Sequence, residues 1–565
     1  MRFIWQKEQN YKLDAFPGEE ENILLFYCTL MFRFWRFEMK KFYCLIFFAA
    51  LMFAVSCGGS KNDDNTDTGD TTPDGDIADT GDTENPDTSD TTDTGDTDSP
   101  DSDSHDTDPT DAESSWTTSD KNEIMLDAKG SSGQVQPKVV KTDDGKIVLT
   151  WLRPEGGDMD SSDFGYRLHL QIFEKDGKAI FGDGGLVVSD KPTLSWTSDY
   201  SLALAPNGEI LIAYWDVRND AGNKESLEAY LYRYDQEGKP VWPAEGVKVE
   251  TEKTTADPSS DMSPDLCVSG GNIYLGVYHY EGETGNYQIF RLKEDGSSAW
   301  EGSLKFDGSA AFLAPAKDGD IYVVYGTDSF GLEARRIDPE GKDVWSDPVK
   351  IEEQPVGSEY YMPEPLMATE EDGTLFLSYR RILDFSGYQV INRLSPDGSL
   401  MNKAKSCDGS EDHDAGSAEM AVHDSKVLVV WGSNFGLNDY HLTANLFDAD
   451  GETLWGENFT GLDLGSNEDW GLVPVKVIPQ KEGWVVLYGD ATGWNSADFI
   501  VRKIDSEGKT SWQRQIGAEN MVANDFAVEY DSSRAYIFYT TESESDDLST
   551  DLRAMCIDIS ESAGE

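Results

Sequence analysis

A short pattern recurs eight times between residues 116 and 565: a tight turn followed by a strand that ends in an aromatic residue. In the first copy, Asp144-Gly145 leads through an apolar run to Trp151. Asp-Gly and Asn-Gly pairs favour two-residue hairpin turns because they tolerate positive φ, and β-branched and aromatic runs are typical of strands. The other copies begin at Asn207-Gly208, Gly270-Gly271, Asp318-Gly319, Asp372-Gly373, Asp424-Ser425, Glu482-Gly483 and Ser532-Ser533, and end at Tyr214, Tyr278, Tyr325, Tyr379, Trp431, Tyr488 and Tyr539.

A second pattern follows most of these copies, namely a turn that ends in Gly with an aromatic residue four positions later. It occurs at Gly177 and Phe181, Gly238 and Trp242, Gly296 and Trp300, Gly341 and Trp345, Gly451 and Trp455, and Gly508 and Trp512; Gly398 keeps the turn but is followed by Asn402. Each unit therefore reads as four strands joined by two tight turns and longer loops. A period of roughly 50 residues is typical of four-stranded propeller blades.

The sequence thus predicts an all-β fold, a β-propeller of four-stranded antiparallel blades. We expect eight blades, or seven if one irregular unit is not a blade. The chain leaves its last unit at Ile557-Asp558-Ile559, which is the end of a third strand. Trp116 precedes Ile124-Met125-Leu126 with the spacing that the other units show between Trp and strand. We therefore expect residues 116–128 to pair with residues 549–559 and close the ring, which would cover two open sheet edges.

The Gly-x-x-x-Trp element resembles the tryptophan-docking repeat of the PQQ-like propellers, as in the segments that end at Trp345 and Trp512. The superfamily includes quinone-cofactor dehydrogenases and BamB, an eight-bladed assembly lipoprotein of the outer membrane, so the resemblance implies an envelope-assembly role as one alternative. The loops between second and third strands are longer and more acidic than in that family, and the vicinal cysteine pair of the dehydrogenases is missing. The resemblance implies that six residues dock against a neighbouring blade: Trp116, Trp242, Trp300, Trp345, Trp455 and Trp512.

The N-terminal region is predicted to be an export signal. Residues 1–38 are interpreted as an upstream start, and residues 39–56 have the two lysines, apolar run and small residue of a signal peptide. The segment Ala54-Val55-Ser56-Cys57 resembles a bacterial lipobox, which implies cleavage before Cys57 and acylation of Cys57. Two or more acyl chains give stable membrane anchoring. Because Gly58 rather than Asp follows Cys57, the family analogy implies sorting to the outer membrane, facing either the cell surface or the periplasm.

Residues 57–115 are predicted to be a disordered tether. Residues 58–115 hold twenty acidic residues and one Lys, and the sequence Asp-Thr-Gly-Asp-Thr occurs at 67–71, 79–83 and 93–97. A segment with so little apolar surface cannot offset its ordering entropy. Asp-rich repeats are able to bind calcium, but no stretch has EF-hand spacing, so we expect neither a cofactor nor a metal site. The whole chain has a formal net charge of −61, which disfavours nucleic-acid binding.

The longer loops of the propeller, such as 216–227 and 489–498, are the candidate binding surface, because both tight turns of every blade fall on the opposite face. Arg153, Arg218, Arg380 and Arg381 follow the ends of second strands and would hold a carboxylate or sulfate if they converged. The alternative is separate loop arginines that pair with nearby acids. Aromatic candidates for ligand binding are Trp196, Tyr360, Tyr361, Trp470 and Trp494.

Catalytic motifs are missing from the sequence. The five histidines after residue 116 lack metal-ligand spacing, and Cys267, Cys407 and Cys556 are expected to be buried apolar residues. We therefore expect a monomeric, non-enzymatic binding or scaffold module for protein or glycan partners. The alternative is a glycan-cleaving, sialidase-like enzyme, which would require the arginines to lie in one pocket beside two carboxylates.

Overall fold

The computed structural model describes residues 124–126, 133–155, 165–193, 200–217, 227–252, 259–281, 284–307, 310–327, 329–357, 364–383, 386–400, 405–406, 414–434, 439–455, 461–468, 471–491, 497–542 and 550–560. The chain divides into two units, Met1–Glu113 and Ser114–Glu565, and all described residues belong to the second. The predicted signal peptide, Cys57, the tether and Trp116 lie outside the described residues. Within the described part of the chain, no helix has the length and apolar character to span a membrane.

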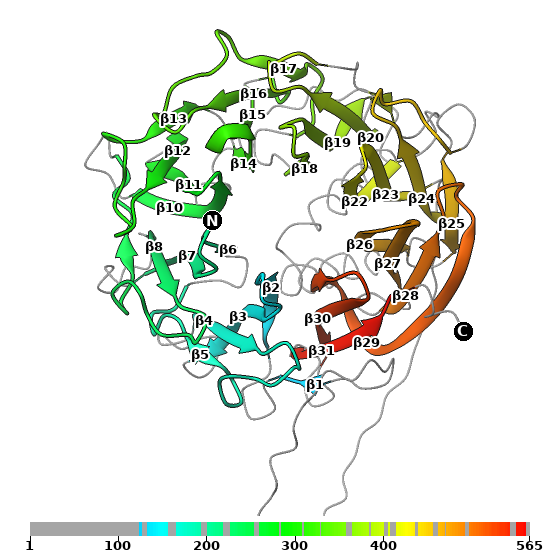
Figure 1. The fold of residues 1–565 in the computed structure, drawn as a ribbon, viewed down its shortest axis with the longest axis horizontal. Coiled ribbons are helices and arrows are strands. Elements are labelled where there is room, and N and C mark those ends of the chain that lie inside the picture. The colour runs from blue at the N-terminus through cyan, green and yellow to red at the C-terminus, as the bar shows by residue number, and fades with distance from the viewer. Residues whose placement is uncertain are drawn as a thin grey trace, which may run out of the picture. The chain divides into compact units, whose positions relative to one another are not determined.

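Eight four-stranded antiparallel blades stand in a ring, which confirms the predicted fold class and blade number (Figure 1). In each blade the first strand lies nearest the centre of the ring and the fourth lies at the outer rim. The described residues contain no α-helix and one 3₁₀ turn, η2 (Lys317–Gly319). The twist of antiparallel sheets lets such blades pack face to face around a common axis.

Blades 1 to 4 follow one another along the chain. Blade 1 comprises β2 (Val135–Lys141), β3 (Ile147–Glu155), β4 (Gly165–Phe173) and β5 (Leu186–Val187). Blade 2 comprises β6 (Ser201–Leu204), β7 (Ile210–Asp216), β8 (Glu228–Tyr234) and β9 (Val247–Lys248). Blade 3 comprises β10 (Ser259–Ser269), β11 (Asn272–Glu281), β12 (Thr284–Leu292) and β13 (Leu304–Asp307). Blade 4 comprises β14 (Ala311–Pro315), β15 (Ile321–Gly326), β16 (Leu332–Ile337) and β17 (Val349–Glu352).

Blades 5 to 8 continue the same order until the ring closes. Blade 5 comprises β18 (Leu366–Thr369), β19 (Leu375–Leu383), β20 (Ser386–Leu394) and β21 (Lys405–Ser406). Blade 6 comprises β22 (Asp414–His423), β23 (Lys426–Asn434), β24 (Tyr440–Phe447) and β25 (Leu462–Asn467). Blade 7 comprises β26 (Leu472–Gln480), β27 (Gly483–Ala491), β28 (Ala497–Ile504) and the first part of β29 (Thr510–Tyr530). Blade 8 comprises the rest of β29, β30 (Arg534–Glu542), β31 (Thr550–Asp558) and β1 (Ile124–Met125).

The strand β1 closes the ring, as the sequence predicted. Ile124 and Met125 pair with Ala554 and Arg553 of β31, and the backbone N–H of Leu126 donates to the carbonyl oxygen of Leu552 over 3.0 Å. The last blade therefore takes three strands from the C-terminal part of the chain and its outer strand from the N-terminal part. Of the predicted segment 116–128, residues 124–126 are described, and these make the pairing with residues 552–554.

The core lies between blades, because each sheet buries both of its faces. Along β3, Ile147 and Trp151 belong to a cluster with residues of blade 8, whereas the alternate residue Val148 belongs to a cluster with residues of blade 2. This alternation follows from the two-residue period of a strand. Strands buried on both faces read as continuous apolar runs, and that is why the runs after each tight turn are so apolar.

In blade 3 the residue that packs toward the preceding blade at the end of the second strand lies one position earlier in the sequence than the predicted aromatic residue. Val277, rather than Tyr278, packs into the cluster that faces blade 2, and Tyr278 packs on the opposite side in the cluster that faces blade 4. The sequence pattern aligned Tyr278 with the aromatic ends of the other second strands. The two-residue turn at Gly270-Gly271 fixes the register, because Ser269 pairs directly with Asn272.

Candidate functional site

The face with the longer loops lies largely outside the described residues. Of the residues predicted to bind a ligand there, Trp196, Arg218, Tyr360, Tyr361, Trp470 and Trp494 are not among the described ones. Arg153, Arg380 and Arg381 are described, and their positions bear on the arginine pocket that a sialidase-like site requires.

These three arginines belong to two blades, and Arg218, the fourth member of the predicted set, lies outside the described residues. Arg153 lies on β3 of blade 1, whereas Arg380 and Arg381 lie on β19 of blade 5, across the ring (Figure 1). The guanidinium of Arg381 donates to a carboxylate oxygen of Glu352 in blade 4 over 2.7 Å, and the Tyr379 hydroxyl donates to the same oxygen over 3.2 Å. The alternative reading, in which an arginine pairs with a nearby acid, therefore describes Arg381.

Four predicted docking tryptophans donate a hydrogen bond to a turn of the next blade. Each indole N–H reaches the carbonyl oxygen of a residue in the turn between third and fourth strands. The acceptors are Glu294 for Trp242 (2.7 Å), Pro339 for Trp300 (2.9 Å), Pro396 for Trp345 (3.1 Å) and Ser506 for Trp455 (3.0 Å). The turns of neighbouring blades are thus tied together on the tight-turn side of the ring.

The turn glycine and the tryptophan of the preceding blade occupy adjacent space, and this explains why the two residue types recur together. Gly341 has φ +80°, and a Cβ atom there would lie 3.2 Å from the indole of Trp300. Gly398 has φ +87°, and its Cβ would lie 3.1 Å from Trp345. Glycine is favoured on both counts, because it adopts positive φ at little cost and leaves room for the ring.

An arginine five residues before the turn glycine adds a second link that the sequence analysis did not identify. Arg291 donates to the carbonyl oxygen of Pro339 over 2.7 Å, which is the oxygen that Trp300 also reaches. Arg336 shares the Pro396 oxygen with Trp345 in the same way, over 2.9 Å. The signal was present, since Arg233, Arg291, Arg336 and Arg393 stand at the same place in blades 2 to 5.

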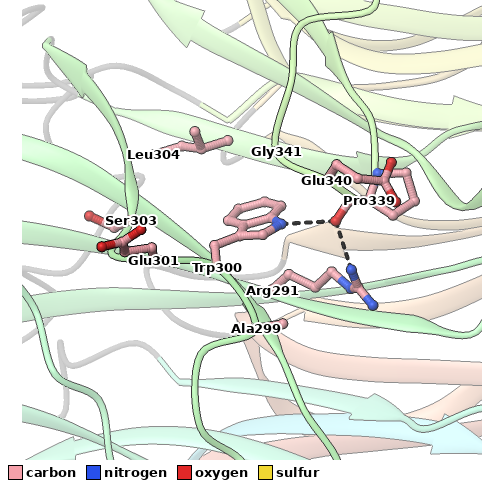
Figure 2. A pocket seen from close by; sticks show the side chains of 9 residues that line it. All are labelled: Arg291, Ala299, Trp300, Glu301, Ser303, Leu304, Pro339, Glu340 and Gly341. Atoms are coloured by element: carbon pink, nitrogen blue, oxygen red, sulfur yellow. Dashed lines mark hydrogen bonds between the residues drawn. The ribbon is translucent and has the colours of Figure 1, made fainter.

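A depression of about 470 Å³ opens at the rim between blades 3 and 4. Figure 2 shows Trp300 at its base, with the Pro339 carbonyl oxygen between the indole nitrogen and the guanidinium of Arg291. Glu301 and Glu340 line the depression and are exposed. It therefore combines an aromatic surface with two carboxylates, at a place where the sequence analysis expected only a structural contact.

Charged residues on the first strands of blades 6, 7 and 8, namely β22, β26 and β29, are close enough to affect one another's pKa. Burial raises the pKa of Glu419 on β22 to about 7, and the nearby ammonium of Lys476 on β26 offsets only part of that shift. Burial also raises the pKa of Glu529 on β29, again with Lys476 as the first opposing charge. Perturbed carboxyl groups often mark functional sites, but ion networks inside a fold also produce them.

Two buried histidines contact carboxylates within blades 1 and 3. His279 Nδ1 lies 2.7 Å from the carboxylate of Asp261, and both side chains are buried. His169 Nδ1 lies 2.8 Å from the carbonyl oxygen of Gly184, and its Nε2 lies 3.3 Å from Glu155. His169 lowers the pKa of the Glu155 carboxyl group by hydrogen bonding. Across the described ranges no three His, Cys, Asp or Glu residues are grouped so as to hold a metal ion.

The described cysteines are buried and free. Burial raises the pKa of the Cys556 thiol to about 12 and that of Cys267 well above its usual value. A thiol that stays protonated at neutral pH is a poor nucleophile. Both residues therefore behave as the apolar core residues that the sequence analysis expected, and Cys407 lies outside the described residues.

No protein-family model and no curated protein matches this chain. Solved structures match it along much of its length. A polysaccharide lyase is 10% identical with a TM-score of 0.40, and the match covers 76% of this chain and 90% of the lyase. A protein of unknown function from Dyadobacter fermentans is 12% identical with a TM-score of 0.35, covering 77% of this chain and 97% of that chain.

An α-L-arabinofuranosidase from Fusarium graminearum is 11% identical with a TM-score of 0.35, and the match covers 79% of this chain and 99% of that enzyme. Likeness at this level of identity and TM-score carries no argument about chemistry.

Proposed function

We propose that this protein is a lipid-anchored module of the bacterial cell envelope that binds protein or glycan partners through the longer loops of an eight-bladed propeller. The proposal rests on one observation, the asymmetry of the two faces. The tight-turn side is tied by repeated contacts such as Trp345 to Pro396. The opposite side carries loops of unequal length on this rigid support, and loops on a rigid support are the usual place for binding.

The contacts between blades also support membership of the PQQ-like propellers. In that superfamily the tryptophan of one blade docks on its neighbour, and the indole-to-carbonyl hydrogen bonds of Trp242, Trp300, Trp345 and Trp455 have that role here. An envelope-assembly role remains an analogy with one family member, since fold alone does not specify function.

Binding through the longer loops is tested with the full-length Cys57→Ala protein on an array of envelope polysaccharides and envelope proteins. One variant has residues 218–225 replaced by a short Gly-Ser linker, and a second has residues 492–496 replaced in the same way. Glu507→Gln on the tight-turn side is the control. We expect the loop variants to lose at least one bound partner that the control retains.

Two results would contradict this proposal. One is that both loop variants retain every bound partner at full affinity. The other is turnover of a glycan that is hydrolysed by the parent protein without being retained, which would favour the sialidase-like alternative.

The anchor is tested separately through Cys57. Replacing it with Ala removes the predicted acylation site, so the protein is expected to move from the membrane fraction to the soluble fraction. Its thermal unfolding should stay unchanged, because Cys57 precedes the propeller by a predicted tether. Metabolic palmitate labelling that persists in the Cys57→Ala protein would refute acylation at this residue.

A further inference from the structure

Trp300 differs from two of its counterparts in what lies over its indole ring. In blade 2 the guanidinium of Arg233 lies 5.6 Å from the ring centre of Trp242, and in blade 7 that of Arg514 lies 5.0 Å from the ring centre of Trp512. Both distances are within the range of a cation–π interaction. No described cationic group makes such a contact with Trp300, whose ring centre lies 5.9 Å from that of Tyr274. Arg291 donates to the Pro339 carbonyl oxygen, and Arg233 makes the equivalent hydrogen bond to the Glu294 carbonyl oxygen while it also lies over Trp242.

Two carboxylates flank this indole without a described partner. Glu301 follows Trp300 directly, and Glu340 precedes the glycine that packs on the ring. Both side chains are exposed, and neither makes a hydrogen bond or ion pair with the described residues. In blade 2, by contrast, the guanidinium of Arg233 over Trp242 is paired with Glu294 over 2.9 Å.

We propose that the depression at Trp300 binds an arginine side chain of a basic polypeptide. The guanidinium lies over the indole of Trp300, as Arg233 lies over Trp242, and pairs with Glu301 and Glu340. A space of about 470 Å³ accommodates such a side chain and part of its backbone. The formal net charge of −61 attracts a basic partner from a distance. Arginine suits this site better than lysine, because its planar group stacks on a ring and pairs with carboxylates at once.

This site is independent of the proposed function of the longer loops. It lies on the tight-turn side, at the rim between blades 3 and 4, and takes its residues from β12, the turn after β16 and the segments beside them. A failure of the loop variants to change binding would leave it untouched. Equally, its failure would say nothing about ligands of the opposite face.

The test measures fluorescence anisotropy of a labelled peptide of three Gly-Arg repeats with the full-length Cys57→Ala protein at 150 mM salt. The first variant is Glu301→Gln with Glu340→Gln. The matched control is Glu482→Gln with Glu507→Gln, which removes the same charge from exposed turn residues of blade 7. We expect the first variant to weaken binding about tenfold and the control about twofold, since distant surface charges are largely screened at this salt.

A second peptide, of three Gly-Lys repeats, tests the role of the guanidinium and should bind several-fold more weakly than the arginine peptide. Equal losses of affinity in the two double variants would overturn the site, because net charge alone would then explain binding. Equal affinity for the two peptides would overturn the stacking arrangement. Saturable binding of maltohexaose that only the first variant loses would show that the depression is a glycan site instead.

Discussion

The interface between blades 4 and 5 and the interface between blades 8 and 1 hold the same ring together with different contacts. In the first, Trp345 and Arg336 both donate to the Pro396 carbonyl oxygen, at 3.1 and 2.9 Å. In the second, the Gln136 backbone N–H donates to the Asp525 carboxylate over 2.8 Å, and the Thr550 hydroxyl donates to the Gln134 carbonyl oxygen. The apolar packing between the sheets is common to both interfaces.

The difference reflects distance along the chain. Trp345 and Pro396 are 51 residues apart, whereas Gln136 and Asp525 are 389 apart. A contact between consecutive blades can be made by the same motif in every repeat, because the two partners are always about one repeat apart. The contact that closes the ring joins segments from opposite ends of the propeller, so it needs residues that occur once. Loop closure makes that contact entropically the costliest to form, although the cost rises only slowly with length.

The largest expected effect is at an ordinary interface. Trp455 is 4% exposed and packs under the turn of blade 7. Trp455→Ala should lower the free energy of unfolding by about 3–5 kcal/mol, the usual cost of truncating a buried tryptophan. Denaturant unfolding followed by circular dichroism measures it. Trp455→Phe keeps an aromatic ring and should lose clearly less; equal losses would mean that the hydrogen bond, and not the packing, stabilises this interface.

Removing the closing strand should cost somewhat less. A protein that begins at Gly133 lacks β1 and the half-buried Leu126, and it exposes the edge of β31. Compared with one that begins at Asp111, we expect a loss of about 3 kcal/mol from the missing backbone hydrogen bonds and apolar contact. Thermal unfolding of both proteins is the measurement. Identical melting temperatures with identical cooperativity would show that β1 contributes nothing to closure.

Within the closing interface, the hydrogen bonds of Asp525 are tested by substitution. Its carboxylate accepts hydrogen bonds from the Gln136 backbone N–H and from the Thr540 hydroxyl, at 2.8 and 2.9 Å. Asp525→Ala leaves both donors without this acceptor and should cost about 2 kcal/mol. Asp525→Asn keeps one acceptor oxygen and should cost less. If thermal unfolding shows the two variants to be equal, charge rather than hydrogen bonding is what the site needs.

The ring of eight blades could be predicted from the sequence because the same motif occurs in every blade. Eight turn-and-strand copies fix the blade number, and the unmatched strand near Ile124 leaves only one way to complete the last blade. A motif that occurs several times is recognisable even where one copy is irregular, as at Asn402. Where a single copy is shifted, as at Tyr278, the clusters into which Val277 and Tyr278 pack reveal it.

The candidate sites were less predictable, since they depend on where different blades place their side chains. Sequence spacing after second strands suggested that Arg153 and Arg381 could converge, but their blades lie across the ring. The depression at Trp300 was missed because Trp300 carries the same motif as Trp242, and the two differ in that a guanidinium, that of Arg233, lies over the Trp242 ring. Such a difference is a matter of side-chain geometry, which a repeat pattern does not encode.

The smallest expected effect is on the pH dependence of the free energy of unfolding. It concerns two carboxyl groups on first strands, Glu419 at an ordinary interface and Glu529 at the closing interface. Burial raises the pKa of Glu419, beside blade 7, to about 7 from an ordinary value of 4.5. Between these two pH values the folded protein binds more protons at this residue than the unfolded chain does. Ionised Glu419 therefore destabilises the fold increasingly as pH rises through this window, and fully above about pH 7.

Glu419→Gln removes that ionisation. It should raise the free energy of unfolding by about 1–2 kcal/mol at pH 8, less than the full shift implies because the side chain keeps some exposure to solvent, and change it little at pH 4.5. Glu529, beside the closing interface, also has a raised pKa, but its carboxylate accepts the Tyr530 backbone N–H and lies near Lys141 and Lys476. Glu529→Gln should therefore gain less at pH 8. Urea unfolding at both pH values measures these gains. A gain for Glu419→Gln that is equal at pH 4.5 and pH 8 would mean that it comes from packing and not from charge.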